Sequence, residues 1–275
     1  MKKILYLLIA ITFFSCEKEE LTTEGIPSYI QINEIVLEDE SVTSNITDAW
    51  VYIDEQLQGV YELPANFPVL AEGKHKLRIK AGIKDNGIAS TRVIYPLYSS
   101  FIIDEQEFIA DQTILINPEV NYLDSSIIKI EDFDEGTGLN FESTEISNVD
   151  YQILDENSDQ FGYASLTSDT LYQFEIASNK LENLPQAGSP VYLELDYKCN
   201  TKFLVGVYVN FPQSVLQKEL LVINQKEDWN KIYINLTPTI SEAVGADFFK
   251  VFIQMRRDFT LDTNTINFDN LKVVY

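Results

Sequence analysis

The chain has 275 residues, and its 43 Asp and Glu residues outnumber its 20 Lys and Arg residues, which gives a formal net charge of −23. Phosphate backbones are bound by clustered basic residues, so this charge argues against a nucleic-acid partner. Hydrophobic residues make up 45% of the chain and aromatic residues 12%, which is typical of folded domains and not of disordered chains. The length predicts two domains.

The first residues have the layout of a secretory signal. Lys2 and Lys3 precede an apolar run over 4–14 that is too short to cross a membrane, and Ser15 and Cys16 follow. The segment resembles a bacterial lipoprotein signal. That resemblance implies that residues 1–15 are removed and that Cys16 carries the lipid. The alternative is an ordinary cleaved signal beside a coincidental cysteine.

The segment directly after Cys16 is charged. Lys18, Glu19 and Glu20 resemble the tag of Bacteroidetes lipoproteins that are exported to the outer face of the outer membrane. The resemblance implies an outer-membrane protein that faces the cell exterior, with residues 16–27 as an acidic tether. A solvated tether without a sorting role is the alternative. Loss of two lysines with the signal leaves 18 basic against 43 acidic residues, a net charge of −25, so we expect the folded part to project away from an anionic membrane surface.

Strand patterns dominate from Ser28 onward, and they predict an all-β protein with two β-sandwich domains. The first domain is predicted over 28–121, and its turns include Asn86-Gly87, the strongest hairpin pattern in the chain. Its short apolar runs are 29–32, 50–54, 76–80, 92–95 and 113–116.

Part of this block resembles a PEGA-type surface domain, a small β-sandwich of bacterial envelope proteins. The residues that carry the resemblance are Val51 to Asp54, Gly59, Leu63-Pro64, Leu70 and Gly73 to Leu77. His75, the only histidine, lies in the last of these segments, and we interpret it as a surface residue because it has no neighbouring Cys or His ligand. Catalysis by a Ser-His or Cys-His pair is also excluded, because His75 and Cys199 fall in different predicted domains.

Pro118 marks the boundary to a second predicted domain over 125–275. A short helix is predicted near Thr239, and Cys199 is predicted to be buried because it shares the parity of apolar residues in its strand. The clearest strand patterns are 164–166, 172–176, 191–199, 203–211, 231–236, 250–255 and 271–275.

Three motifs in this block resemble a jelly-roll carbohydrate-binding module, also called a galactose-binding-like domain. They are Ile130 to Asp134, Asp228 to Leu236 and Asn267 to Val273. The resemblance implies that the C-terminal sandwich is a jelly roll and that it binds without catalysis. A glycosidase is not indicated by the acidic residues, because 43 of them make a close carboxylate pair almost inevitable.

The same resemblance implies a structural calcium ion, held by carboxylates from the first and last strands. The matching positions here are Glu131, Asp132, Asp134 and Asp269. Carboxylate oxygens suit Ca²⁺, and extracellular calcium is abundant enough for weak sites. The alternative is that these residues are solvent-exposed strand ends.

Strand parity predicts a ligand-binding face. If the valines and leucines of three strands point inward, the residues between them share the opposite side. The candidates on that side are Tyr192, Tyr208, Asn210, Phe252, Gln254 and Arg256. If these strands are neighbours, rings beside amides and charges would form a surface on which sugars stack; an ordinary solvated sheet face is the alternative.

The predicted function is therefore a non-catalytic surface lipoprotein that binds a glycan or an envelope protein. The competing prediction is a structural or assembly subunit of an outer-membrane complex, in which both sandwiches act as scaffold. A glycan binder should expose aromatic side chains in a hollow, whereas a scaffold should expose a broad apolar patch.

Overall fold

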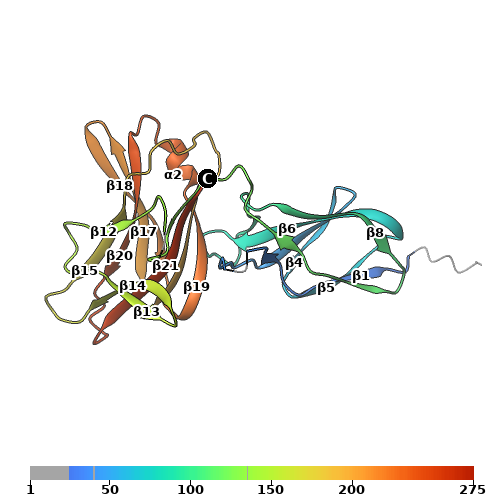
Figure 1. Cartoon of the computed structure of the whole chain (residues 1–275), viewed down its shortest axis with the longest axis horizontal. Helices are drawn as coiled ribbons and strands as arrows, with labels where there is room; N and C mark the ends of the chain where they lie inside the picture. Colours follow the sequence, from blue (N-terminus) through green and yellow to red (C-terminus); the bar gives the residue numbers. More distant parts are fainter. Residues whose placement is uncertain (1–24, 40, 135) are drawn as a thin grey trace, which may run out of the picture.

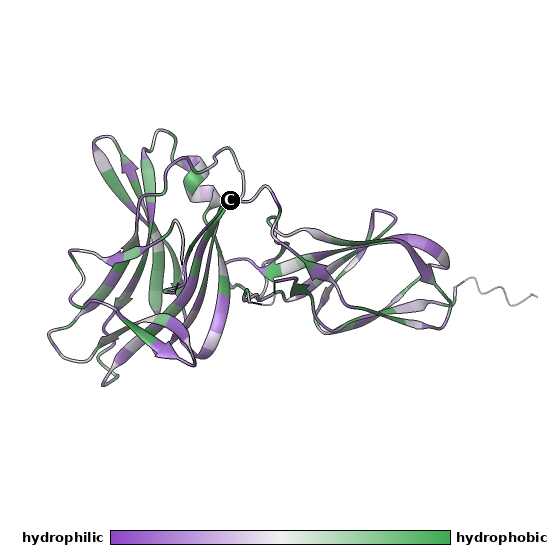
Figure 2. Ribbon diagram, viewed as in Figure 1, coloured by the Kyte–Doolittle hydropathy of each residue, from purple (hydrophilic) through white to green (hydrophobic). Residues whose placement is uncertain are grey.

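The computed structural model describes residues 25–275 except 40 and 135. It consists of two β-domains arranged end to end along the long axis of the molecule (Figure 1). Apart from the six-residue helix α2 (Thr237–Glu242), all of the named elements are strands. The predicted all-β fold is confirmed. The alternation of apolar and polar residues along the strands, visible as colour changes in Figure 2, is what a sandwich requires, because successive strand side chains point to opposite faces.

The first domain contains a three-stranded sheet in the order β5-β1-β9 and a sheet in the order β4-β3-β6-β7, to which β8 is added on β6. The short strands β10 and β2 pair with each other. Ile30, Val51 and Ile79 belong to its buried core. The strands of this domain are β1 (Ser28–Ile32), β2 (Val36–Leu37), β3 (Asp48–Ile53), β4 (Gln56–Glu62), β5 (Ala65–Val69), β6 (Gly73–Lys84), β7 (Arg92–Ile94), β8 (Ser100–Phe108), β9 (Thr113–Ile116) and β10 (Glu119–Val120).

The second domain is a jelly roll of two antiparallel sheets. One sheet has the order β13-β14-β21-β16-β19 with β11 also paired to β21, and the other has the order β12-β15-β20-β17-β18. The strands are β11 (Ile128–Glu131), β12 (Phe141–Ser143), β13 (Gln152–Glu156), β14 (Asp159–Leu166), β15 (Gln173–Ser178), β16 (Tyr192–Cys199), β17 (Phe203–Phe211), β18 (Ser214–Ile223), β19 (Lys226–Asn235), β20 (Phe248–Arg256) and β21 (Asn264–Val274).

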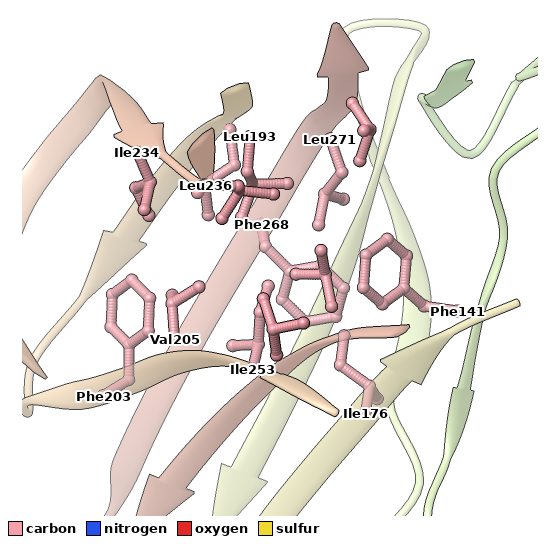
Figure 3. Close-up of a cluster of buried hydrophobic side chains, with 14 of the residues drawn as sticks. Phe141, Ile176, Leu193, Phe203, Val205, Ile234, Leu236, Ile253, Phe268 and Leu271 are labelled. Carbon is pink, nitrogen blue, oxygen red and sulfur yellow. The ribbon is translucent and has the colours of Figure 1, made fainter. Parts of the chain in front are cut away.

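The core of the jelly roll lies between its two sheets (Figure 3). Leu193 and Phe268 project from one sheet toward Val205 and Ile253 of the other, and all four are fully buried. Cys199 is buried at the end of β16, as its parity predicts. Truncating a fully buried Phe of this kind to Ala costs about 3–5 kcal/mol, so this layer is the main source of stability for the second domain.

The first domain docks on the outer face of the β16–β19 side of the jelly roll. The hydroxyl of Tyr95 donates to Glu194 Oε1 at 2.5 Å, and that of Tyr122 donates to Glu194 Oε2 at 2.8 Å. The ring of Tyr95 also packs against those of Tyr192 and Tyr233, with centroids 5.0 Å away in both cases. These contacts join the two domains through a buried polar and aromatic cluster.

The Asn86-Gly87 turn forms part of the same junction. The amide N–H of Asn86 donates to the carbonyl of Tyr233 at 2.9 Å, and Asn86 Oδ1 accepts from the N–H of Asn235. Gly87 has φ +68°, and a Cβ there would lie 2.8 Å from the side chain of Ile232. Glycine is therefore needed both for the turn and for the close approach of the first domain to β19.

Candidate functional site

Five of the six residues predicted to bind a ligand lie on one outer face of the jelly roll. Tyr208 and Asn210 come from β17, and Phe252, Gln254 and Arg256 come from β20. The two strands are antiparallel neighbours with Gly206 opposite Phe252, so alternate residues of both strands share that face. We call this surface, which β15 completes, the Tyr208 face.

The prediction for Tyr192 is wrong. This residue belongs to β16, which lies in the other sheet, and only 4% of it is exposed because the first domain covers it. Desolvation by this burial raises the pKa of its hydroxyl, and the negative charge of the neighbouring Asp85 raises that pKa further. At Tyr192 this face of the sheet packs against the first domain, so the ring is not open to a ligand.

Phe252 and Gln254 point outward as predicted, but neither is open to stacking. Phe252 is fully buried and Gln254 is 3% exposed. The ring of Phe252 lies across Gly206, where a Cβ would be 2.3 Å from the ring, and the ring of Tyr208 covers it with centroids 4.7 Å apart. Phe252 is thus the floor beneath Tyr208, and Tyr208 is the ring that a ligand can reach.

Glu175 on β15 organises the Tyr208 face, although no sequence prediction named it. Its Oε1 accepts from the hydroxyls of Tyr208 at 2.7 Å and Thr144 at 2.9 Å, and its Oε2 accepts from Gln254 Nε2 at 2.6 Å. Gln254 Oε1 in turn accepts from Arg256 Nε at 3.0 Å. Burial and the adjacent carboxylate raise the pKa of Tyr208, so its hydroxyl stays protonated and donates.

The sequence does contain a signal for Glu175, because it is a charged residue within the apolar run Phe174 to Ala177. A fully buried carboxylate is costly unless hydrogen bonds compensate for the water that it loses. Here three donors do so, which fixes the side chains of Tyr208 and Gln254 in one arrangement. The network therefore presents a pre-organised surface.

Two hollows open on this face. The first has a volume of about 410 Å³ and is lined by Tyr208 and Asn210 together with Ile146, Val215 and Lys250, among other residues. Val215 is 61% exposed and Ile146 is 51% exposed, so accessible apolar side chains line this hollow together with polar ones. The second hollow, of about 220 Å³, lies near Arg256.

The predicted calcium ligands lie on separate segments of the jelly roll. Glu131 is the last residue of β11, and its side chain accepts a hydrogen bond from the N–H of Phe133. The side chain of Asp134 accepts one from the N–H of Gln160 at 3.4 Å. Asp269 lies on β21 and is 4% exposed. Among the described residues, no group of three or more His, Cys, Asp or Glu side chains is placed to hold a metal ion.

The charge of Asp132 contributes to a pKa shift of Asp269. The pKa of Asp269 is raised to about 7, chiefly by desolvation and also by the charges of Asp159, Asp196 and Asp132, while the hydrogen bond from the Asn270 N–H lowers it. Calcium at this cluster stays a prediction.

The predicted lipidation and export residues, Cys16, Lys18, Glu19 and Glu20, lie outside the described residues. Within the described part of the chain, no helix is long and apolar enough to cross a membrane.

The chain is similar in structure to several solved carbohydrate-binding modules. A family 11 module from Clostridium thermocellum in complex with a β-1,3-1,4-mixed-linked tetrasaccharide is 14% identical, with 53% of this chain and 94% of that chain covered and a TM-score of 0.36. A family 22 xylan-binding domain from Paenibacillus barcinonensis is 14% identical, covering 54% and 97% with a TM-score of 0.38. A family 29 module from Piromyces equi is 12% identical, covering 55% and 91% with a TM-score of 0.36. No family model matches the chain, and no curated protein has a matching sequence.

Proposed function

We propose that this protein is a lipid-anchored lipoprotein of the outer membrane that binds a glycan on its Tyr208 face without catalysing a reaction. The observation that carries the proposal is the Glu175 network beside the 410 Å³ hollow, which fixes an accessible tyrosine among apolar and polar groups. Binding sites for small ligands combine such apolar walls with a few fixed polar groups. Sugars have the matching chemistry, because their C–H faces pack on rings and their hydroxyls bond with amides and amines.

The arrangement of the domains is compatible with an anchor at the N-terminus. β1 lies at the end of the first domain that is remote from the jelly roll (Figure 1). A lipid on Cys16, joined to β1 by the acidic tether, would place the jelly roll farthest from the membrane. Cys16→Ser should abolish partitioning into the detergent phase, because acyl chains supply about 0.8 kcal/mol of membrane binding per buried CH₂; unchanged partitioning would refute the anchor. Export to the cell exterior is tested separately, by replacing Lys18, Glu19 and Glu20 with Ala and measuring cleavage by added protease.

A glycan-array screen of the purified chain, followed by calorimetry with the bound glycan, tests the proposed binding. Lys250→Gln removes a half-buried amine from the hollow, and Tyr208→Phe removes the hydroxyl that bonds Glu175. Each variant should weaken binding about tenfold, as expected for the loss of one hydrogen bond in a ligand site. Lys129→Gln on β11, another half-buried lysine outside this face, is the matched control and should bind normally.

The screen also separates the two predicted functions. Absence of any bound glycan, or binding that the Tyr208-face variants leave unchanged, would contradict the proposal. The first of these outcomes would favour the scaffold alternative.

A further inference from the structure

A further hollow, distinct from the two on the Tyr208 face, lies between the two domains, and it shares no lining residue with the hollow at Tyr208. Its volume is about 470 Å³, within the range of about 300–1,000 Å³ that is typical of small-ligand pockets. The hairpin segment 86–89 of the first domain forms one wall. The β18–β19 loop at 224–225, together with Lys226 and residues 230–233 of β19, forms the other. We call it the interdomain hollow.

The charge of this hollow is opposite to that of the whole protein. Its described lining residues include Lys84, Lys226 and Lys231 but no Asp or Glu, although acidic residues outnumber basic ones 43 to 20 in the chain. Asp85 follows Lys84 directly, but it does not line the hollow, and its Oδ2 accepts from Asn235 Nδ2 at 3.4 Å. An anion entering here therefore meets lysines without competing carboxylates on the walls.

Two of the three lysines are available to a ligand. The ammonium group of Lys231 lies 3.3 Å from Glu194 and 3.8 Å from Asp196, so its charge is already compensated inside the domain junction. Within the described residues, Lys84 and Lys226 form no ion pair. Lys226 is exposed and Lys84 is half-buried, so both can reach a ligand in the hollow.

Side-chain amides supply most of the remaining polar groups. They belong to Asn45, Asn86, Asn224, Gln225 and Asn230. Hydrogen bonds across the junction fix two of them. Asn45 Nδ2 donates to the carbonyl of Lys231, and Asn86 Oδ1 accepts from the N–H of Asn235. The side chains of Asn224 and Gln225 make no hydrogen bond with described residues. An amide both donates and accepts, which suits a ligand that is rich in hydroxyl groups.

The backbone of β19 offers little to a peptide strand here. β19 is the edge strand of its sheet, and edge strands are where peptides add by main-chain pairing. The outward carbonyl of Lys231 already accepts from Asn45 Nδ2 at 2.8 Å, and that of Tyr233 accepts from the N–H of Asn86 at 2.9 Å. The side-chain groups of the hollow, and not its main chain, remain for recognition.

We propose that the interdomain hollow binds a short acidic oligosaccharide, with its carboxylates held by Lys84 and Lys226 and its hydroxyls held by the amides. This site is additional to the glycan face at Tyr208. Because its walls come from both domains and are fixed to each other by hydrogen bonds, little ordering is needed when the ligand binds.

Calorimetry with the purified full chain tests the proposal, with trigalacturonate as the probe and neutral galactotriose and a triglutamate peptide as comparisons. Trigalacturonate should bind at least tenfold more tightly than either comparison, and binding should weaken as salt screens the lysines. Lys84→Gln and Lys226→Gln should each weaken it about tenfold, the change expected for one charge-assisted hydrogen bond. Lys198→Gln, an exposed lysine on β16 that does not line the hollow, is the matched control and should have no effect.

A second variant tests the location without removing charge. Ala89→Trp places a large ring at an exposed position of the hairpin wall and should abolish binding of trigalacturonate. Lys250→Gln on the Tyr208 face should not affect it. Absence of trigalacturonate binding at millimolar concentration, or binding that survives Ala89→Trp but is lost in Lys250→Gln, would overturn the proposal. Equally tight binding of triglutamate would assign the hollow to acidic peptides instead.

Discussion

Replacement of Glu194 by Ala should reveal how strongly the two domains depend on each other. Glu194 is fully buried and accepts hydrogen bonds from Tyr95 and Tyr122 of the first domain. Its Oε2 also lies 3.3 Å from the ammonium group of Lys231, whose side chain is only 3% exposed. The variant leaves two buried hydroxyls and a buried charge with fewer partners. Breaking a buried pair in this way costs about 3–5 kcal/mol, and we expect the free energy of unfolding to fall by that amount.

Guanidinium unfolding followed by fluorescence of the two tryptophans, Trp50 and Trp229, and by circular dichroism measures this loss. Since the lost contacts join the domains, the variant should unfold with the two probes no longer coincident. The exposed Glu156→Ala on β13 is the control and should change stability by less than about 0.5 kcal/mol. The double variant Glu194→Leu, Lys231→Met should recover part of the loss, because it removes both buried partners of the 3.3 Å ion pair together and leaves only Asp196 without its weaker contact to Lys231 at 3.8 Å. A loss below 1 kcal/mol in Glu194→Ala, or a double variant that is less stable than the single one, would refute this reasoning.

Three further predictions concern other parts of the molecule. His75 Nδ1 lies 2.6 Å from Asp54 Oδ2, and this hydrogen bond raises the His75 pKa above 6.5. Because His75 is the only histidine in the chain, its ring signals in an NMR pH titration should show one midpoint above 6.5, which Asp54→Asn should lower. The stability from this pair should be complete below pH 6.5 and lost as pH rises through the folded pKa. Gly206→Ala should destabilise the jelly roll by about 1–3 kcal/mol in urea unfolding, because a Cβ would lie 2.3 Å from the ring of Phe252. Calcium at Asp269 predicts a melting temperature that is lower in EDTA by about 5–10 °C, the shift for a hundredfold excess over Kd; Asp269→Ala should abolish the difference, and a temperature unmoved by EDTA refutes the calcium prediction.

Local patterns were sufficient to predict the elements where one strand face is apolar. The run 203–211 coincides with β17, and the inward residues Val205, Val207 and Val209 are all buried in the core. The predicted helix near Thr239 exists as α2, beginning two residues earlier with Pro238 in its first turn. By contrast, β18 was not predicted, because it is an edge strand with exposed polar and apolar residues and a register shift against β17. Alternation is weak where neither face is fully buried.

Alternation alone could not predict which residues share the candidate face. A period of two shows which side of its own strand a residue lies on, but it does not show which strands belong to the same sheet. β16 has the same pattern as β17 and β20, yet it lies in the opposite sheet. Glu194 and Tyr95 are 99 residues apart in sequence and meet only after both domains have folded. The glutamate between the buried Leu193 and Leu195 has the pattern of a solvated outer face, and charged residues are seldom fully buried, so nothing in the local sequence indicates that this side of β16 is covered.

The docking of the first domain explains why the two candidate sites lie where they do. It covers the outer face of the β16–β19 side through Tyr95 and Tyr122. The outer face of the opposite sheet, which carries the Glu175 network, is not covered by these contacts. The same docking leaves the interdomain hollow at the margin of the contact, where the Asn86-Gly87 turn meets β19. Because that hollow needs both domains whereas the Tyr208 face needs one, separating the domains by Glu194→Ala should impair binding in the hollow before it impairs binding at Tyr208.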